Sequence, residues 1–413
     1  MSSRKVQKKY DVVLYGATGF VGRQTAAYFA QHALTQGRPV RWALAGRSAD
    51  KLAAIKASCG GGASNAGIVV ADAQDISALD ALARDAAVVL STAGPFALYG
   101  SELVAACVRH GTHYVDITGE TPWVHEMIQR HHAQAARDGT RIIPFCGFDS
   151  IPSDIGTWLL TQAMQQQFGE PCQSVKASFS VRGGLNGGTL ASVLNILGTG
   201  QAKAFADPFL LNPQGVRPAN PSRHKDPIVP HNDRDFRAWL APFFMGPINT
   251  RVVRRSAALL AYGDDFEYQE YLRIGSGLLA GAAATSLSMG MASSQWALTL
   301  GPVRAMAKRM APSPGEGPSE RSMDNGSFRC ELIGKSAQGH KVFARIADKG
   351  DPGNRATTKM VCESALCLAL NQNELPGGKG WGGVLTPASG LGEVLVQRLR
   401  NAGMTLEVQT KTS

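Results

Sequence analysis

The feature that most constrains the fold is a glycine-rich turn between a predicted strand and a predicted helix. The apolar run Tyr10–Tyr15 predicts a buried strand, and a helical pattern runs from Phe20 to Thr35. In such a turn the first glycine permits the tight bend, the second lets the backbone approach a pyrophosphate, and the third lets the helix pack on the strand. The start of the helix adds free N–H groups and positive potential. The GxxGxxG spacing is familiar in NADP-linked enzymes and predicts a dinucleotide phosphate site made by Gly16, Ala17, Thr18, Gly19, Phe20, Val21 and Gly22.

The same alternation of strand and helix continues through the first third of the chain. Short apolar strands are predicted at Tyr10–Tyr15, Val40–Ala45, Gly67–Ala71, Ala87–Thr92, His113–Ile117 and Arg141–Phe145. Amphipathic helices separate them, which predicts a parallel sheet with right-handed crossovers. We therefore expect an α/β fold in which a Rossmann-type, doubly wound parallel sheet occupies residues 10–147, after a basic tail at residues 1–9.

Residues at the ends of the predicted strands indicate which dinucleotide binds. NAD-selective sites usually place a carboxylate after the second strand, where it binds the ribose hydroxyls. Here that strand is followed by Arg47 and Ser48, and a guanidinium pairs with a 2′-phosphate by charge-assisted hydrogen bonds. This pattern predicts NADP(H). After the third strand, Asp72 either meets the adenine edge or caps the next helix. After the fourth strand, small residues that let the cofactor approach the backbone are Thr92, Ala93, Gly94 and Pro95.

The length of 413 residues and a change of pattern predict a second domain. Alternating residues at Ser174–Val181 predict a strand, and Gly326–Lys335 and His340–Asp348 flank a turn, which predicts a β-hairpin. Residues 206–235 are rich in Pro, Asp and Asn and predict a functional or covering loop rather than a linker. We expect a mixed α+β domain with its own mixed sheet at residues 148–385.

One long stretch in this second domain, residues 274–303, contains no charged residue although Arg273 and Arg304 flank it. The stretch is long enough to span a bilayer, but Gly, Ala, Ser and Thr dominate it. The spacing of Gly277 and Gly281 suits close helix packing. We therefore expect a buried or interfacial helix in preference to a membrane span. A third interpretation is a hydrophobic surface for acyl chains or for peripheral membrane contact.

The composition limits which binding partners and which cellular compartment are expected for this protein. A formal net charge of +10 suits anionic ligands such as phosphates or acidic lipid surfaces, while the scattered Lys and Arg residues do not indicate nucleic acid. The seven cysteines include no Cys-x-x-Cys pair, which favours reduced thiols, and no Cys or His spacing predicts a metal site. The basic tail runs directly into a strand without a signal-peptide pattern, so we expect a cytoplasmic protein.

Several segments together carry a family resemblance. They are YDVVLYGATGFVG, the AGR after the second strand, STAGPFALYG, HYVDITGE, CGFDSIPSD and TPASGLGEVLVQRL. They resemble the saccharopine dehydrogenase-like oxidoreductases, and most of all the bacterial branch of trans-acting enoyl reductases. The resemblance is specific for residues 10–156 and looser between 200 and 330.

This resemblance implies an NADP-dependent reductase of a hydrophobic enoyl or acyl thioester, free or carrier-bound, in lipid metabolism. It also implies a second domain whose sheet makes a homodimer contact. The C-terminal segment 386–413 is expected to return towards the Rossmann domain, so that the turn at 386–390 approaches the cofactor.

The residues alone leave the proton donor open. Enoyl reduction needs a proton for the α-carbon and a hydrogen-bond donor for the developing enolate oxygen. None of the eight tyrosines has a Lys four residues later, which excludes the short-chain dehydrogenase arrangement. The catalytic candidates are Tyr99, Asp149 and Ser150. For Tyr99, a packed structural tyrosine is an equally good interpretation. For Ser150 or Ser153, a helix cap is an equally good one. For Asp116 and Glu120, after the fifth strand, binding and structural roles are evenly matched.

Two other functions stay open at this point. An amino-acid dehydrogenase that forms a saccharopine-like secondary amine needs arginines for the substrate carboxylates. No spacing singles out any of Arg182, Arg234, Arg237, Arg254 and Arg255. The other alternative is a non-catalytic, NADP-binding, lipid-associated protein that kept the fold, because no unambiguous proton donor is present.

Overall fold

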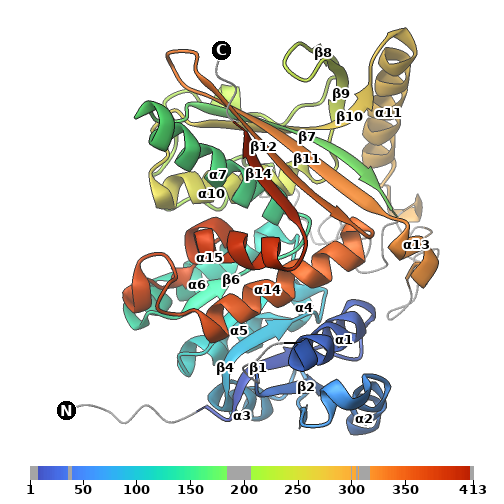
Figure 1. The fold of residues 1–413 in the computed structure, drawn as a ribbon, viewed down its shortest axis with the longest axis vertical. Helices are drawn as coiled ribbons and strands as arrows, with labels where there is room; N and C mark the ends of the chain where they lie inside the picture. The colour runs from blue at the N-terminus through green and yellow to red at the C-terminus, as the bar shows by residue number, and fades with distance from the viewer. Residues whose placement is uncertain are drawn as a thin grey trace.

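The structure, a computed structural model, describes residues 8–35, 40–183, 206–298, 300–303, 306 and 317–409. It contains two seven-stranded sheets, and Figure 1 shows α14 (Thr357–Leu370) and α15 (Pro387–Asn401) between them. Sheet A is parallel throughout and has the order β13-β6-β5-β4-β1-β2-β3. Its strands are β1 (Tyr10–Tyr15), β2 (Trp42–Gly46), β3 (Gly67–Val70), β4 (Ala86–Ser91), β5 (His113–Asp116), β6 (Arg141–Ile143) and β13 (Gly383–Val384).

This order is that of a Rossmann fold with one added strand, which confirms the predicted fold class. Helices cover both faces of sheet A, so its strands are near-continuous apolar runs: Val12 and Val13 in β1 and Val88 and Val89 in β4 are fully buried. The chain order reverses between β1 and β4, which are neighbours, and ligands bind at such a switch point. The helices of this part are α1 (Phe20–Thr35), α2 (Ala49–Ser58), α3 (Ile76–Asp85), α4 (Phe96–Tyr99), α5 (Ser101–Arg109) and α6 (Thr121–Asp138).

Sheet B is mixed, with the order β14-β12-β11-β7-β10-β9-β8, and only β7 and β10 pair in parallel. One of its faces packs on α7, through β11 and β12. The predicted hairpin is confirmed, since β11 and β12 pair antiparallel along their whole lengths. Its strands are β7 (Ser174–Arg182), β8 (His231–Asp233), β9 (Ala238–Pro242), β10 (Glu267–Gly275), β11 (Ser327–Lys335), β12 (Lys341–Lys349) and β14 (Thr405–Gln409). The remaining helices are α7 (Ile151–Phe168), α10 (Gly246–Leu260), α11 (Leu278–Ala297) and α13 (Glu320–Asp324), with short turns η1 (Gly60–Ala63), η2 (Pro221–His224), η3 (Pro352–Ala356) and η4 (Gly378–Gly380).

The C-terminal part of the chain joins both sheets. Helix α14 packs on β1, β4 and β5, β13 extends sheet A beside β6, and β14 pairs with β12 in sheet B. The return to the Rossmann layer therefore begins at α14, earlier than the expected boundary at 386, and the last strand lies in the second sheet. Helix α14 is buried almost all round because it covers sheet A on one side and contacts α15 on the other.

The uncharged stretch 274–303 contains the expected helix, α11, but this helix lies on the surface of sheet B and is not fully buried. Strand β10 extends to Gly275, and α11 packs on β9 and β10 through a narrow stripe in which Gly281, Ala284 and Ser288 are buried. A Cβ at Gly281 would lie 2.8 Å from the ring of Trp239, which explains the small residues on this side. The outer face is open, and Leu278 is 93% exposed. No helix in the described ranges is long and apolar enough to cross a membrane.

Candidate active site

The glycine turn after β1 has the geometry that a dinucleotide phosphate requires. Gly16 has a φ of +85°, and a Cβ there would lie 2.9 Å from the amide nitrogen of Ala93. A Cβ at Gly22 would lie 2.1 Å from the carbonyl oxygen of Gly16, so both glycines are required by the chain itself. At Gly19 a Cβ would approach only this same oxygen, at 3.3 Å, which leaves Gly19 as the place of close ligand approach. Helix α1 has no acidic residue in its first turn, so its positive end is available to a phosphate.

A second turn, after β4, is fixed against the first. The Thr92 hydroxyl donates a hydrogen bond of 3.2 Å to the carbonyl of Gly16. The backbone N–H groups of Phe96 and Ala97 donate to the two carboxylate oxygens of Glu120, at 2.8 and 3.1 Å. Glu120 is only 1% exposed and lies after β5. The ends of three neighbouring strands, β1, β4 and β5, are therefore joined here. Glu120 therefore has the structural role that the sequence left undecided, and it holds the turn that contains Ala93, Gly94 and Pro95.

Of the residues predicted after β2 and β3, Arg47 is an exposed cation, whereas Ser48 and Asp72 accept local backbone hydrogen bonds. Arg47 is exposed, and no described residue makes a hydrogen bond or ion pair with its guanidinium. The Ser48 side chain accepts a hydrogen bond from the N–H of Lys51 and caps α2, and Asp72 accepts one from the N–H of Gln74. Burial, with the charge of Asp72, raises the pKa of Tyr15 to about 12, while Arg47 opposes this shift. Arg47 and Asp72 thus lie near Tyr15 at the end of β1.

Arg23 is a cation at the turn that the sequence interpretation missed. Its Nη1 donates to the carbonyl of Thr18 at 3.3 Å, and the guanidinium lies 5.8 Å from the ring centre of Phe20. The available signal was a basic residue directly after the third glycine. Arg23 adds positive charge beside the expected phosphate site.

The catalytic candidates are in two different settings. Asp149 lies in the loop after β6 and is partly exposed, and burial raises its pKa to about 7. No hydrogen bond or ion pair to its carboxyl is found among the described residues. Tyr99 is 41% exposed on the short helix α4, and within the described chain its hydroxyl has no hydrogen-bond partner. Both groups are therefore available to a substrate.

Ser150 is not free, although it occupies the N-cap position of α7. Its buried hydroxyl donates to the Asn249 side chain at 3.1 Å, and it makes no capping hydrogen bond to α7. The Asn249 amide donates to Glu270 at 2.8 Å, and Ser153 and Tyr268 donate to the same carboxylate at 2.7 Å each. Burial raises the pKa of Glu270 to about 7. This network ties the loop of Asp149 to α10 and β10, and it could not be predicted from sequence because the partners lie about a hundred residues apart.

Asp116 is a structural residue at the end of β5. It is fully buried, and its carboxylate accepts hydrogen bonds from the N–H groups of Thr118 and Phe145 and from the hydroxyl of Tyr114. Burial raises its pKa to about 7. It links the ends of β5 and β6 and so positions the loop that begins at Phe145.

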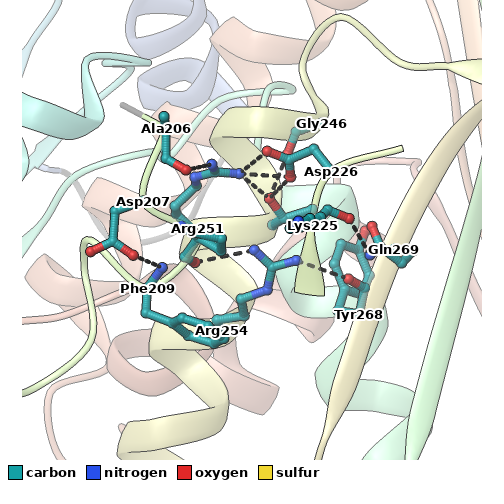
Figure 2. A network of polar contacts seen from close by, with 12 residues as sticks. Ala206, Asp207, Phe209, Lys225, Asp226, Gly246, Arg251, Arg254, Tyr268 and Gln269 are labelled. Carbon is teal, nitrogen blue, oxygen red and sulfur yellow. Dashed lines mark hydrogen bonds and ion pairs between the residues drawn. The ribbon is translucent and has the colours of Figure 1, made fainter. Parts of the chain in front are cut away.

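Figure 2 shows what the arginines of α10 do. Arg251 forms an ion pair of 2.5 Å with Asp226, and Arg254 donates to the carbonyls of Pro208 and Tyr268 and lies over the ring of Phe209. These arginines hold residues 206–226 on the second domain, which agrees with a covering loop. Arg255 is also buried and donates to the backbone carbonyls of Leu211, in the same loop, and of Val384 in β13. Arg254 and Arg255 are therefore engaged by the protein and do not form a site for substrate carboxylates.

The fold and the two fixed turns define a dinucleotide-binding oxidoreductase of the Rossmann class. Residues 12–143 match the family described as saccharopine dehydrogenase NADP binding domain, which confirms NADP(H) as the cofactor. A trans-acting enoyl reductase of Mycobacterium ulcerans is 37% identical over 423 residues, covering 97% of this chain and 98% of the relative. One from Mycobacterium tuberculosis H37Rv is 36% identical over 422 residues with the same coverage. A further relative of this kind from the same strain reaches 40% over 421 residues, with 97% of each chain covered.

The chain belongs to the trans-acting enoyl reductase family, within the saccharopine dehydrogenase-like oxidoreductases. Among solved structures, the saccharopine dehydrogenase (L-Glu forming) of Saccharomyces cerevisiae aligns with 97% of this chain and 99% of its own, with a TM-score of 0.50 and 13% identity. At that identity the likeness concerns the fold, including the second mixed sheet.

Proposed function

We propose that the protein reduces the carbon–carbon double bond of an enoyl thioester with NADPH, and that Asp149 supplies the proton. The observation that carries the assignment of Asp149 is an acid with a pKa of about 7 and no protein partner in the described chain, at the carboxyl end of β6. A group with this pKa is partly protonated at neutral pH and suits general acid catalysis. The relatives named as trans-acting enoyl reductases support the substrate class.

The roles of the residues follow from where they lie. Gly19 and the start of α1 bind the pyrophosphate, and Arg47 binds the 2′-phosphate. Bound NADPH supplies the hydride for the β-carbon. The protonated Asp149 carboxyl gives its proton to the α-carbon, which leaves a saturated thioester and an aspartate that takes up a proton from water. Tyr99 is the candidate donor to the thioester oxygen.

The test compares the wild-type protein with Asp149→Asn in NADPH oxidation assays on 2-enoyl thioesters of increasing chain length. We expect the wild-type kcat to fall as the pH rises through about 7, because the protonated acid is the active form. Asp149→Asn should lower kcat by roughly 10²–10⁴-fold and remove this pH dependence, with an unchanged Kd for NADPH. Tyr99→Phe, the matched variant, should lower kcat and keep the pH profile. Wild-type protein that binds NADPH but turns over no enoyl thioester would contradict the proposal.

The amino-acid dehydrogenase alternative receives no support from Arg254 and Arg255, because both are buried against backbone carbonyls. The homodimer and the peripheral membrane contact stay predictions. The second of these has the exposed apolar face of α11 in its favour.

A further inference from the structure

A hollow at one end of sheet B is lined by four cations, of which Lys359 is paired with Asp348 at 2.7 Å. Arg182, at the end of β7, and Lys349, at the end of β12, lie on either side of Ser327 in adjacent strands. In the next row, Arg329 lies between Ser180 and Ala347. The small side chains between the cations leave a hollow of about 800 Å³. We call Arg182, Arg329 and Lys349 the cationic patch.

Nothing in the described chain neutralises this patch. All three side chains are exposed, and none makes a hydrogen bond or ion pair with a described residue. No two of the three cations lie directly opposite each other, because Ser327 separates Arg182 from Lys349. Elsewhere on the same sheet the cations are paired: Arg273 with Glu331 at 3.0 Å, and Lys335 with Asp235 at 2.7 Å. The charges of the patch are therefore open to solvent and available to an external anionic partner.

The patch lies beside the part of the second domain that contacts the cofactor site. Gly183 follows Arg182, and a Cβ at Gly183 would lie 2.9 Å from both Asp351 and Pro352. Four residues further on, Arg355 donates to Gln24 of α1 at 3.1 Å, two positions after the last glycine of the turn. Figure 1 shows this end of β7 and β11 near α13, on the side of sheet B that faces α1.

We infer that the cationic patch docks an acidic face of the carrier protein that delivers the acyl chain. This inference rests on the proposed function. A carrier protein holds its acyl group as a thioester at the end of a flexible phosphopantetheine arm, so it must dock near the cofactor cleft but not inside it. Exposed cations at such a place favour the encounter with an acidic surface and select against basic ones.

The experiment uses one enoyl group in two forms: crotonyl loaded on an isolated, acidic acyl carrier protein, and the same crotonyl group on pantetheine. The triple variant Arg182→Glu, Arg329→Glu and Lys349→Glu is compared with wild type and with Lys379→Glu, an exposed cation in η4 beside α6. We expect the triple variant to raise KM for the carrier-bound substrate roughly tenfold or more and to leave kcat/KM for crotonyl-pantetheine unchanged. Lys379→Glu should change neither value. Raised salt should weaken only the carrier-bound reaction of the wild type.

Calorimetric binding of the loaded carrier, without turnover, separates this inference from the proposed function. If wild type binds the carrier more tightly than the triple variant but reduces neither substrate, docking stands and the proposed reaction fails. If the two proteins bind the carrier equally, or if KM rises equally for both substrates, the docking inference is overturned. Binding to phosphatidylserine vesicles that the triple variant loses, with carrier binding intact, would also overturn it and would assign the patch to a lipid surface. The conservative variants Arg329→Gln and Lys349→Gln, one charge removed each, give the same test with less risk to folding.

Discussion

At the scale of single residues, we propose that Arg47 decides between the two pyridine nucleotides. Its guanidinium is exposed at the end of β2 and has no partner in the described structure, so a 2′-phosphate gains a charge-assisted bond without breaking another. We expect Arg47→Ala to weaken NADPH binding by roughly 1.5–3 kcal/mol and to leave the Kd of NADH unchanged. Titration calorimetry with both nucleotides measures this. Ser48→Ala is the control, since Ser48 caps α2 and should affect thermal stability and not the preference between nucleotides. An unchanged preference in Arg47→Ala would remove Arg47 from the cofactor site.

At the scale of elements, Glu120 holds the turn after β4 through two backbone N–H groups. A glutamine at this position keeps one acceptor oxygen and turns an amide donor towards the second N–H group. We therefore expect Glu120→Gln to cost about 1–3 kcal/mol of stability and to raise the Kd of NADPH several-fold, because Ala93 and Gly94 lose their fixed position. Denaturant unfolding and nucleotide titration give the two numbers. Asp72→Asn, at another turn of the same sheet, keeps the acceptor for Gln74 and should leave stability unchanged. Normal NADPH affinity in Glu120→Gln would show that the turn does not contact the cofactor.

Also at this scale, the sequence predicted the elements that depend on nearby residues. The glycine turn, the strand starting at Tyr10 and the hairpin of β11 and β12 follow from local pattern and turn chemistry. The pairing of β13 with β6 joins residues more than two hundred positions apart, and a strand of two residues carries no pattern. The partners of Ser150 were hidden for the same reason. For α11 the sequence left buried and interfacial positions open, because the absence of charge shows that a segment is apolar but not whether another element covers it.

At the scale of the whole molecule, burial of carboxyl groups makes stability depend on pH. Asp116, Asp149, Asp154 and Glu270 each have a pKa raised by burial to about 7. Between the ordinary pKa near 4 and the raised value, the folded protein keeps protons that the unfolded chain releases. The slope of the unfolding free energy with pH is therefore negative in this window. The contribution of these four groups to stability should be greatest at the acid end of this window, fall as the pH rises towards 7, and level off above that value.

Asp116 offers the clearest test of this dependence. In Asp116→Asn, the remaining oxygen can still accept from Thr118 and Phe145, and the new amide can donate to the hydroxyl of Tyr114, so the links between β5 and β6 are kept. The side chain at position 116 no longer titrates in this variant. Between pH 5 and 7 its unfolding free energy should therefore fall less steeply than that of wild type, with a difference in slope of up to about 1.4 kcal/mol per pH unit. Urea unfolding at several pH values measures both slopes, and the variant should be the more stable protein near pH 8. Equal slopes would mean that Asp116 is ionised in the folded protein throughout this range, held in that form by the three donors around it and not neutralised by burial.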